Sequence, residues 1–400
     1  MSRSTAAASG VARALGAIGP ALWLLAGIGF ISQVGISVML PLLPLYATEL
    51  GAPPVVLGLL TSAFAVTNAI GQVIAGFLSE RWGPRRTMSG GLGLYASMNA
   101  LIATAASAGW LLLWRTTAGF GGGAMIVSER LYLVRSVEPA RRAFANSIVS
   151  AGQSAGTVTG PLVGGVAAAI GGLRAPFVIV AATSLIALIG TLFLPAQGRP
   201  TTTHDPATPH EPLVLRPLAL LLLANLAMLA SYGAFITTYA TLATQRLAWS
   251  LVDVGIAFSF FGAGSIILGP WLGHTADRIG RRTIAILAPI TLAAFGLGLV
   301  LGLPQPIIYA IAFLGGGGLT AFSASWYALL ADAAGERRMG RVFGVVSAAS
   351  TIGIVVGSTG AAALWTSVDI AAGMLLGALL PLVAVGAMLA FRPRAVPSPR

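Results

Sequence analysis

Two stretches of the chain repeat each other: GFLSERWGPRR at residues 76–86 and GHTADRIGRR at residues 273–282. Both follow the pattern Gly-x3-acid-Arg-x-Gly-x-Arg, and they stand about 197 positions apart. Two shorter segments, RAF at 142–144 and RVF at 341–343, recur at nearly the same offset. A repeat over half of the chain length indicates that the protein is built from two related units.

The composition around these stretches is too apolar for a water-soluble protein. Of 400 residues, 56% are hydrophobic and 8% are charged, and the mean hydropathy is +0.88. A soluble domain carries about a quarter charged residues, so most of the surface of this chain must face lipid. We therefore predict an all-α membrane protein.

Apolar runs long enough to cross about 30 Å of hydrocarbon recur along nearly the whole chain. The first run continues past the core length of a signal peptide without a small-residue cleavage site, so we predict a retained span. A proline- and threonine-rich segment at 195–216 is predicted to be a flexible linker between six-helix bundles at 1–194 and 217–400. The twelve predicted spans are 20–46, 56–79, 87–107, 110–134, 142–170, 175–194, 217–244, 252–276, 283–302, 304–331, 340–366 and 368–391.

The positions of the arginines predict how the chain is oriented. All 23 basic residues are arginines. With a cytoplasmic N-terminus, all of them except Arg115, Arg174 and Arg246 fall on the cytoplasmic side or at the cytoplasmic end of a span. The positive-inside rule therefore predicts a multi-pass protein of the cell's inner membrane with both termini in the cytoplasm. The arginines lie in short clusters between apolar runs, so the formal charge of +12 does not indicate a nucleic-acid partner.

Missing residue types exclude several kinds of site. The chain has no cysteine and no lysine, which excludes disulfides, thiolate metal sites and a P-loop lysine. The spans contain no His-Glu-x-x-His motif, paired aspartates or Ser-His dyad. We therefore predict no enzyme activity, no metal and no cofactor, although the sequence leaves a receptor or scaffold role open.

The doubled stretch resembles the signature that the major facilitator superfamily carries between spans 2 and 3 and again between spans 8 and 9. The resemblance implies twelve transmembrane helices in two pseudo-symmetric six-helix bundles, the major facilitator fold. It also implies a cytoplasmic gate that stabilises the outward-facing state. The first copy departs from the family at Pro84, where a basic residue is usual, and Arg135 stands at the place of Asp332 in the other half. The predicted gate residues are Gly76, Glu80, Arg81, Gly83, Arg85, Arg86, Gly273, Asp277, Arg278, Gly280, Arg281, Arg282 and Asp332.

The fifth predicted span carries a regular series of small residues around a proline. Glycines at four-residue spacing let helices touch, and a proline bends a helix at a packed hinge. The pattern resembles the antiporter signature of the family and favours export, while generic helix packing is the alternative. The predicted hinge residues are Gly156, Gly160, Pro161, Gly164 and Gly165.

Two charged residues in the fourth predicted span are candidates for proton coupling. Arg115-x3-Gly119-x-Gly121 resembles a third family signature, whose buried arginine is implicated in proton transfer. The equivalent region of span 10 has no arginine. Glu129 is the best acidic candidate, because the first span lacks a membrane acid. The alternatives are that Arg115 is an interfacial anchor and that Glu129 anchors the cytoplasmic end of the span.

Polar and aromatic residues recur at helical spacing in several spans, which suggests a wet path between the two halves. Each residue alone is as consistent with a helix-packing hydrogen bond as with a ligand contact. The predicted substrate-binding residues are Gln33, Asn68, Gln72, Gln153, Asn225, Tyr232, Tyr239, Trp326 and Tyr327.

The functional hypothesis is proton-coupled efflux of a small organic or drug-like compound by alternating access, as the family resemblance implies. Facilitated or proton-linked transport of a sugar or metabolite is the alternative, because buried acids are scarce. The expected partners are a small-molecule substrate, protons and membrane lipid, and the expected state is a monomer.

Overall fold

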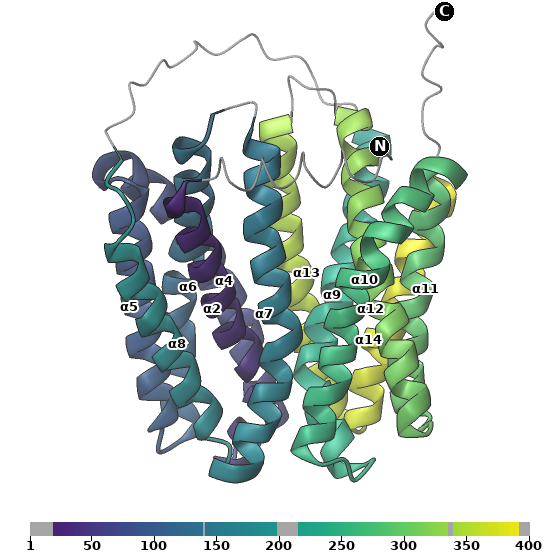
Figure 1. Cartoon of the computed structure of the whole chain (residues 1–400). Helices are drawn as coiled ribbons and strands as arrows, with labels where there is room; N and C mark the ends of the chain where they lie inside the picture. Colours follow the sequence, from purple (N-terminus) through teal and green to yellow (C-terminus); the bar gives the residue numbers. More distant parts are fainter. Residues whose placement is uncertain (1–18, 139–140, 198–214, 335–338, 392–400) are drawn as a thin grey trace, which may run out of the picture.

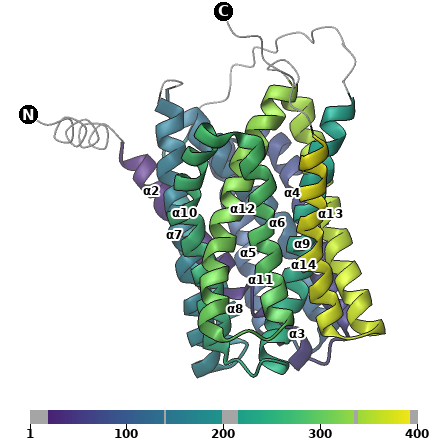
Figure 2. The same ribbon diagram turned by 90° about the vertical axis from the view of Figure 1, so that its right-hand side faces the viewer.

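The computed structural model describes residues 19–138, 141–197, 215–334 and 339–391. The described residues form thirteen α-helices and no β-strand. Figure 1 shows α2 to α8 and α9 to α14 as two bundles side by side, and Figure 2 shows the second bundle in front of the first. The helices are α2 Pro20–Met39, α3 Leu43–Glu49, α4 Pro54–Trp82, α5 Pro84–Ala103, α6 Ala108–Ser136, α7 Arg142–Gly171, α8 Ala175–Leu192, α9 Leu215–Gln245, α10 Leu251–Ile279, α11 Arg281–Val300, α12 Gln305–Ala334, α13 Met339–Ser367 and α14 Ile370–Ala390.

Ten of these helices are long and apolar enough to cross a membrane by length and composition. The other two long helices are α5, with 20 residues, and α6, with 29 residues, which extend about 30 and 44 Å. Polar and charged residues lower their hydropathy, among them Arg85 and Arg86 in α5 and Arg115 and Glu129 in α6. Each of the twelve predicted spans thus corresponds to one long helix. Charged residues in α5 and α6 lower the hydropathy of these two helices below that of the other ten.

The first predicted span, 20–46, is not one helix. Helix α2 ends at Met39, the chain makes a turn in which Leu42 N–H donates to the Met39 carbonyl, and α3 begins at Leu43. Pro41 explains the break, because its nitrogen carries no hydrogen to continue the helical ladder and its ring clashes with the preceding turn. The Tyr46 hydroxyl then ties α3 to the end of α5 by donating to the Ile102 carbonyl over 3.1 Å.

Glycines on α7 and α13 bring helix backbones into contact within each half. A Cβ on Gly156 would lie 2.7 Å from the Phe30 carbonyl oxygen, and one on Gly160 would lie 2.6 Å from the Ser37 Cβ, both on α2. At the same offset in the second half, Gly353 and Gly357 meet backbone atoms of α9 in the same way. Lipid gives no hydrophobic drive for helix association, so such close backbone packing is a main source of cohesion.

The doubled stretch forms the turn between α4 and α5 and its counterpart between α10 and α11. Gly83 has φ +86° and Gly280 has φ +102°, values that residues with a side chain rarely adopt. Gly76 and Gly83 are not sites of close helix approach, because no atom beyond the local backbone lies within 4 Å of either Cβ position. Glycine at the turn is therefore required for backbone conformation rather than for packing.

The arginine two residues after each turn glycine stabilises the end of another helix. Arg85 donates from Nε to the Thr191 carbonyl over 3.0 Å and from Nη2 to the Leu192 carbonyl over 2.6 Å, at the C-terminus of α8. Arg282 donates in the same way to Met388 over 3.1 Å and Leu389 over 2.7 Å, at the C-terminus of α14. A cation at this position satisfies carbonyls that have no partner in their own helix and opposes the negative end of the helix dipole.

We predict that Arg85→Ala and Arg282→Ala each lower the melting temperature of the purified protein in detergent. Each change leaves two helix-terminal carbonyls without their charged donor, at a cost of about 1–2 kcal/mol. Arg86→Ala is the matched control, because Arg86 is exposed on the same helix. An equal loss in Arg86→Ala would show that the effect comes from the charge of the segment and not from the capping bonds.

We also predict that Gly160→Ala destabilises the first half. The added methyl group would overlap Ser37 and the Val34 carbonyl, and overpacking of this kind costs about 1–3 kcal/mol. Gly90→Ala, on α5, is the control, since no atom lies within 4 Å of its Cβ position. Thermal unfolding of both variants is the measurement. A melting temperature of Gly160→Ala equal to that of the unmodified protein and of Gly90→Ala would contradict the packing argument.

Candidate functional site

A cavity of about 350 Å³ lies between the two halves. Its size is within the range of small-molecule sites, which are mostly apolar with a few placed polar groups. The first half contributes α2 to α6 and the second half contributes α9 and α13. The lining residues are Ile36, Leu40, Leu43, Thr61, Phe64, Ala65, Asn68, Ala69, Gln72, Tyr95, Arg115, Gly122, Ile126, Tyr232, Ile236, Ser347, Ser350, Thr351 and Ile354.

The glycine contacts between the two halves lie toward one end of the bundles and extend to the middle of α10, where a Cβ on Gly262 would lie 3.2 Å from the Val158 Cα of α7. We call the end where α8 stops and α9 starts the linker end, at the top of Figure 1, and the opposite end the far end. Near the far end, a Cβ on Gly58 of α4 would lie 2.8 Å from the Ser358 carbonyl oxygen of α13, and Gly255 of α10 abuts the Pro161 carbonyl of α7. Asn68 and Gln72 follow Gly58 along α4, so the cavity lies on the linker side of these contacts.

The predicted hinge glycines face two different neighbours. Gly156, Gly160 and Gly164 pack against α2, whereas a Cβ on Gly165 would lie 2.6 Å from the Leu251 carbonyl oxygen of α10 in the other half. Pro161 lies inside α7, which continues from Arg142 to Gly171. This segment of α7 therefore contacts both its own half, at α2, and the other half, at α10. Its action as a hinge stays a prediction.

Arg115 is a buried cation at the wall of the cavity. Its side chain is 6% exposed, and its guanidinium carbon lies 3.7 Å from the centre of the Phe64 ring, in cation–π geometry. Nη1 approaches the Met39 sulfur at 3.6 Å, and Nε has no hydrogen-bond partner among the described residues. No described carboxylate forms an ion pair with Arg115.

Amides and hydroxyls from both halves also line the cavity. Gln72 donates to Asn68 Oδ1 over 2.8 Å, and Asn68 reaches the Gly119 carbonyl at 3.5 Å, so the pair bridges α4 and α6. Across the cavity, Asn225 donates to Ser350 over 2.8 Å, which holds a lining hydroxyl of α13 against α9. Several polar groups of the cavity therefore already have a hydrogen-bond partner within the protein.

Glu129 occupies a separate buried site in the first half. It is 5% exposed, and the Gln153 amide of α7 donates to both carboxylate oxygens at 3.2 Å. A Cβ on Gly29 of α2 would lie 2.8 Å from Glu129 Oε1, so three helices enclose the carboxyl group. Glu129 stands fourteen residues after Arg115 on α6, which places the two about 21 Å apart along the helix.

Several predicted substrate-binding residues do not line the cavity in this conformation. Gln33 donates to Ser37 within α2. Tyr239 is buried and donates to the Val254 carbonyl over 2.8 Å, and Trp326 is buried and donates to the Leu221 carbonyl over 2.8 Å. Tyr327 lies against the Trp326 ring. Their role in substrate binding stays a prediction.

Sequence analysis missed Phe64, Tyr95 and the α13 hydroxyls Ser347, Ser350 and Thr351, all of which line the cavity. The hydroxyls recur at three- and four-residue intervals, the spacing of one helix face, so this signal was available. Phe64 and Tyr95 gave no such signal, because aromatic residues in an apolar helix are as common on faces that contact lipid as on faces that line a cavity.

A small apolar pocket of about 50 Å³ in the second half adjoins the cavity. Tyr232 of α9 lines both spaces. Phe235, Phe258, Phe261 and Phe295 line the pocket, and the Phe235 and Phe295 rings lie 5.4 Å apart. The second half thus presents aromatic surface next to the polar cavity.

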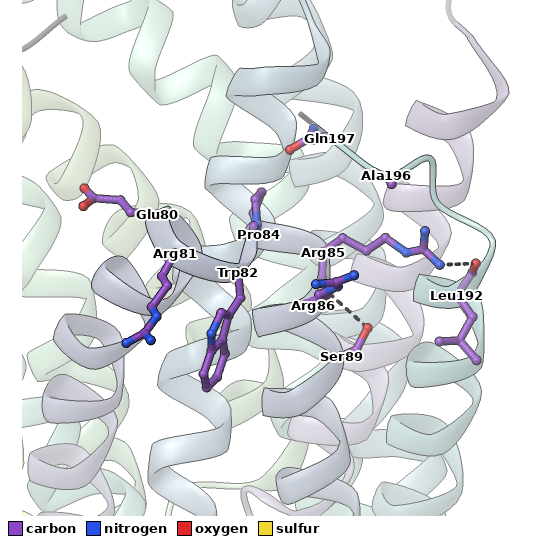
Figure 3. Close-up of a pocket in the computed structure, with 11 residues that line it drawn as sticks. Glu80, Arg81, Trp82, Pro84, Arg85, Arg86, Ser89, Leu192, Ala196 and Gln197 are labelled. Carbon is purple, nitrogen blue, oxygen red and sulfur yellow. Dashed lines mark hydrogen bonds between the residues drawn. The ribbon is translucent and has the colours of Figure 1, made fainter. Parts of the chain in front are cut away.

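The predicted gate residues lie at the linker end. Figure 3 shows Glu80, Arg81 and Trp82 on one side of the α4–α5 turn and Arg85 reaching Leu192 on the other, around a hollow of about 550 Å³. Gly273 and the side chain of Asp277 lie outside what the structure describes.

Contacts of the gate region that the structure describes join helices of the same half. Arg135 of α6 reaches the Ser79 carbonyl of α4 at 3.4 Å, and Asp332 of α12 pairs with Arg281 of α11 at 3.3 Å. Arg135 and Asp332 carry opposite charges at equivalent positions of the repeat. Each has a suitable partner, because Arg135 donates to a backbone carbonyl and Asp332 pairs with an arginine. Whether these groups clasp the two halves in another conformation stays a prediction.

No group of three or more His, Cys, Asp or Glu side chains within the described part of the chain is placed to hold a metal ion.

Comparisons with known proteins identify the family. The Major Facilitator Superfamily model matches residues 25–244 and 220–400. Multidrug resistance protein MdtG of Proteus mirabilis (strain HI4320) is 29% identical over 293 residues, which cover 70% of this chain and 71% of MdtG. Quinolone resistance protein NorA of Staphylococcus aureus (strain MRSA252) is 28% identical over 243 residues, which cover 58% of this chain and 62% of NorA.

Solved structures agree on the fold. A mutant of the nucleoside transporter NupG superposes with a TM-score of 0.76 at 11% identity, over 93% of this chain and 98% of that one. A bacterial homologue of the human lysosomal transporter Spinster, in an inward-facing and unoccupied conformation, superposes with a TM-score of 0.68 at 17% identity, over 93% of both chains. The chain therefore belongs to the major facilitator superfamily and is a multi-pass membrane transporter of small molecules, related to multidrug efflux proteins.

Proposed function

We propose that this transporter exports small organic compounds from the cytoplasm in exchange for protons, by alternating access of the central cavity. The observation that carries the proposal is a cavity shared by the two halves that lies on one side of the close contacts between them. The names of MdtG and NorA, which refer to multidrug and quinolone resistance, support efflux as its direction.

The proposed units are two bundles, at 1–194 and 217–400, joined by the linker at 195–216. They rock about the cavity, and the transporter works as a monomer. In the described conformation α7 and α10, and α4 and α13, touch near the far end. The arginine distribution favours the linker end as the cytoplasmic side of the inner membrane, where anionic lipid attracts basic residues. The structure then corresponds to an inward-facing state that is ready to take up substrate.

Glu129 is the proposed proton site. An ionised carboxylate is costly inside a membrane protein unless it is paired, and the described partner of Glu129 is the neutral amide of Gln153. A protonated carboxyl group can remain in this enclosure, whereas an ionised one favours a conformation that admits water. Arg115 and Glu129 share the helix α6, so a shift of this helix can link the proton site to the cavity.

We predict that substrate efflux depends on the proton gradient and that Glu129→Gln abolishes this dependence. The measurement is transport of ethidium, fluorescein and Nile red, as probes of each charge type, by proteoliposomes with and without an imposed pH difference. One pH unit supplies about 1.4 kcal/mol per proton, so substrate accumulation with such a difference should exceed accumulation without it by about tenfold for one-to-one exchange. The amide retains the shape and the contact with Gln153 but cannot release a proton.

Glu138→Gln is the matched control for proton coupling, because it removes the same charge from an exposed site at the linker end. Unchanged coupling in Glu138→Gln is expected. If the unmodified protein transports equally with and without the pH difference, facilitated transport of a sugar or metabolite would be favoured instead.

We predict that a cysteine in the cavity reacts faster from the cytoplasmic side, because the described conformation opens there. The chain contains no native cysteine, so Ser347→Cys, at an exposed cavity position, introduces the only thiol. A membrane-impermeant maleimide should label it faster in inside-out vesicles than in right-side-out vesicles. Thr104→Cys, in the exposed turn between α5 and α6, should show the opposite pattern, and a reversal of both patterns would overturn the proposed orientation.

A further inference from the structure

The cavity contains a buried positive charge that the protein itself does not neutralise. Arg115 is 6% exposed, and its Nε lacks any hydrogen-bond partner among the described residues. Its described neighbours are the Phe64 ring, the Met39 sulfur and the Tyr95 hydroxyl, none of which carries a negative charge. Such a charge within a membrane protein is costly unless it faces a cavity or a counter-ion.

The acidic residues that the structure describes are all engaged or located elsewhere. Glu129 is held by Gln153, Asp332 pairs with Arg281, and Asp369 pairs with Arg246. Three further carboxylates are exposed outside the cavity, and another belongs to the helix cap of α10. These four are Glu49, Glu80, Glu138 and Asp253. None of the lining residues of the cavity is acidic.

The fold itself does not require a charge at this place. The repeat position of Arg115 in the second half is Ala312, which is fully buried in the equivalent helix α12. The glycines around Arg115 do have counterparts, since Gly119 and Gly121 of α6 correspond to Gly316 and Gly318 of α12 and all four meet neighbouring helices. The packing is thus conserved between the halves while the charge occurs in only one of them.

Aromatic surface lies across the cavity from this cation. Tyr232, on α9 of the second half, lines both the cavity and the adjoining pocket formed by Phe235, Phe261 and Phe295. An elongated molecule can therefore contact Arg115 with one end and the aromatic pocket with the other. Such a molecule would touch both halves of the transporter at once.

We propose that the cavity binds an amphipathic organic anion, with a carboxylate or sulfonate paired to Arg115 and an aromatic body against Tyr232 and the neighbouring phenylalanines. A planar oxyanion can accept hydrogen bonds from the Nε and an Nη of one guanidinium group, a strong and directional arrangement. The inference rests on the proposed transport function and specifies the substrate class for the same cavity.

The test compares three naphthalene compounds that differ in charge: 2-naphthoate, 2-naphthamide and 2-naphthylmethylammonium. Binding to the purified full-length protein in detergent is measured by isothermal titration calorimetry at pH 7.5. We expect 2-naphthoate to bind about tenfold or more tightly than the amide, and the ammonium compound to bind least. Equal binding of all three compounds, or preference for the ammonium compound, would overturn the proposal.

Variants separate a ligand-binding role of Arg115 from a structural one. Arg115→Gln should remove the preference for 2-naphthoate over 2-naphthamide, and Arg115→Lys should retain part of it. Without ligand, Arg115→Gln should melt at or above the temperature of the unmodified protein, because an uncompensated buried charge is removed. A lower melting temperature together with an unchanged charge preference would overturn the proposal.

Tyr232→Leu provides a second variant that leaves the cation in place. It should weaken binding of 2-naphthoate and 2-naphthamide by similar factors and leave the ratio between them unchanged. A change in the ratio alone would contradict the proposed division between a charged and an aromatic end.

The test does not depend on transport. Equilibrium binding in detergent needs no proton gradient, so a lost charge preference with intact gradient-driven efflux rejects only the substrate class. Tight and selective binding of 2-naphthoate without any efflux would reject the proposed export and leave the anion site standing.

Discussion

Close contact between helix backbones is the constraint on which the rest of this structure depends. Helices in lipid gain little from hiding apolar side chains, so cohesion comes from packing at short range and from hydrogen bonds. Helix α7 illustrates this, because Gly156 and Gly160 bring it against α2 while Gly165 brings it against α10 of the other half. One helix thereby holds its own bundle together and also forms part of the contact that closes the cavity at the far end.

The internal repeat supplies the scaffold twice, whereas the buried charges that the structure describes occur only in the first half. The turn glycines Gly83 and Gly280, with the capping arginines that follow them, have nearly identical geometry in both halves. Inside the bundles this symmetry is lost. The position equivalent to Glu129 is Trp326, which is buried and binds a backbone carbonyl. The first half thus holds the buried charges Arg115 and Glu129, and the second half presents hydroxyls and aromatic surface to the cavity.

This division has a physical advantage for alternating access. A ligand that pairs with Arg115 and packs against Tyr232 would join the two halves across the cavity, and its contacts would change as they rock. Glu129 lies away from the cavity and is enclosed by α2, α6 and α7. The proposed substrate and proton sites are therefore separate, and helix α6 carries a residue of each, Arg115 and Glu129, without direct contact between them.

The sequence by itself determined the membrane class, the long helices and the repeat, because hydropathy and glycine spacing are local properties of the chain. It also pointed to Asn68, Gln72, Arg115 and Tyr232, which line the cavity. Only the tertiary structure decided that Tyr239 and Trp326 face packed cores, that Pro41 divides the first span, and that Arg85 and Arg282 cap distant helices. The reason is that helical spacing says which residues share a face, whereas the neighbour of that face depends on contacts between segments far apart in the chain.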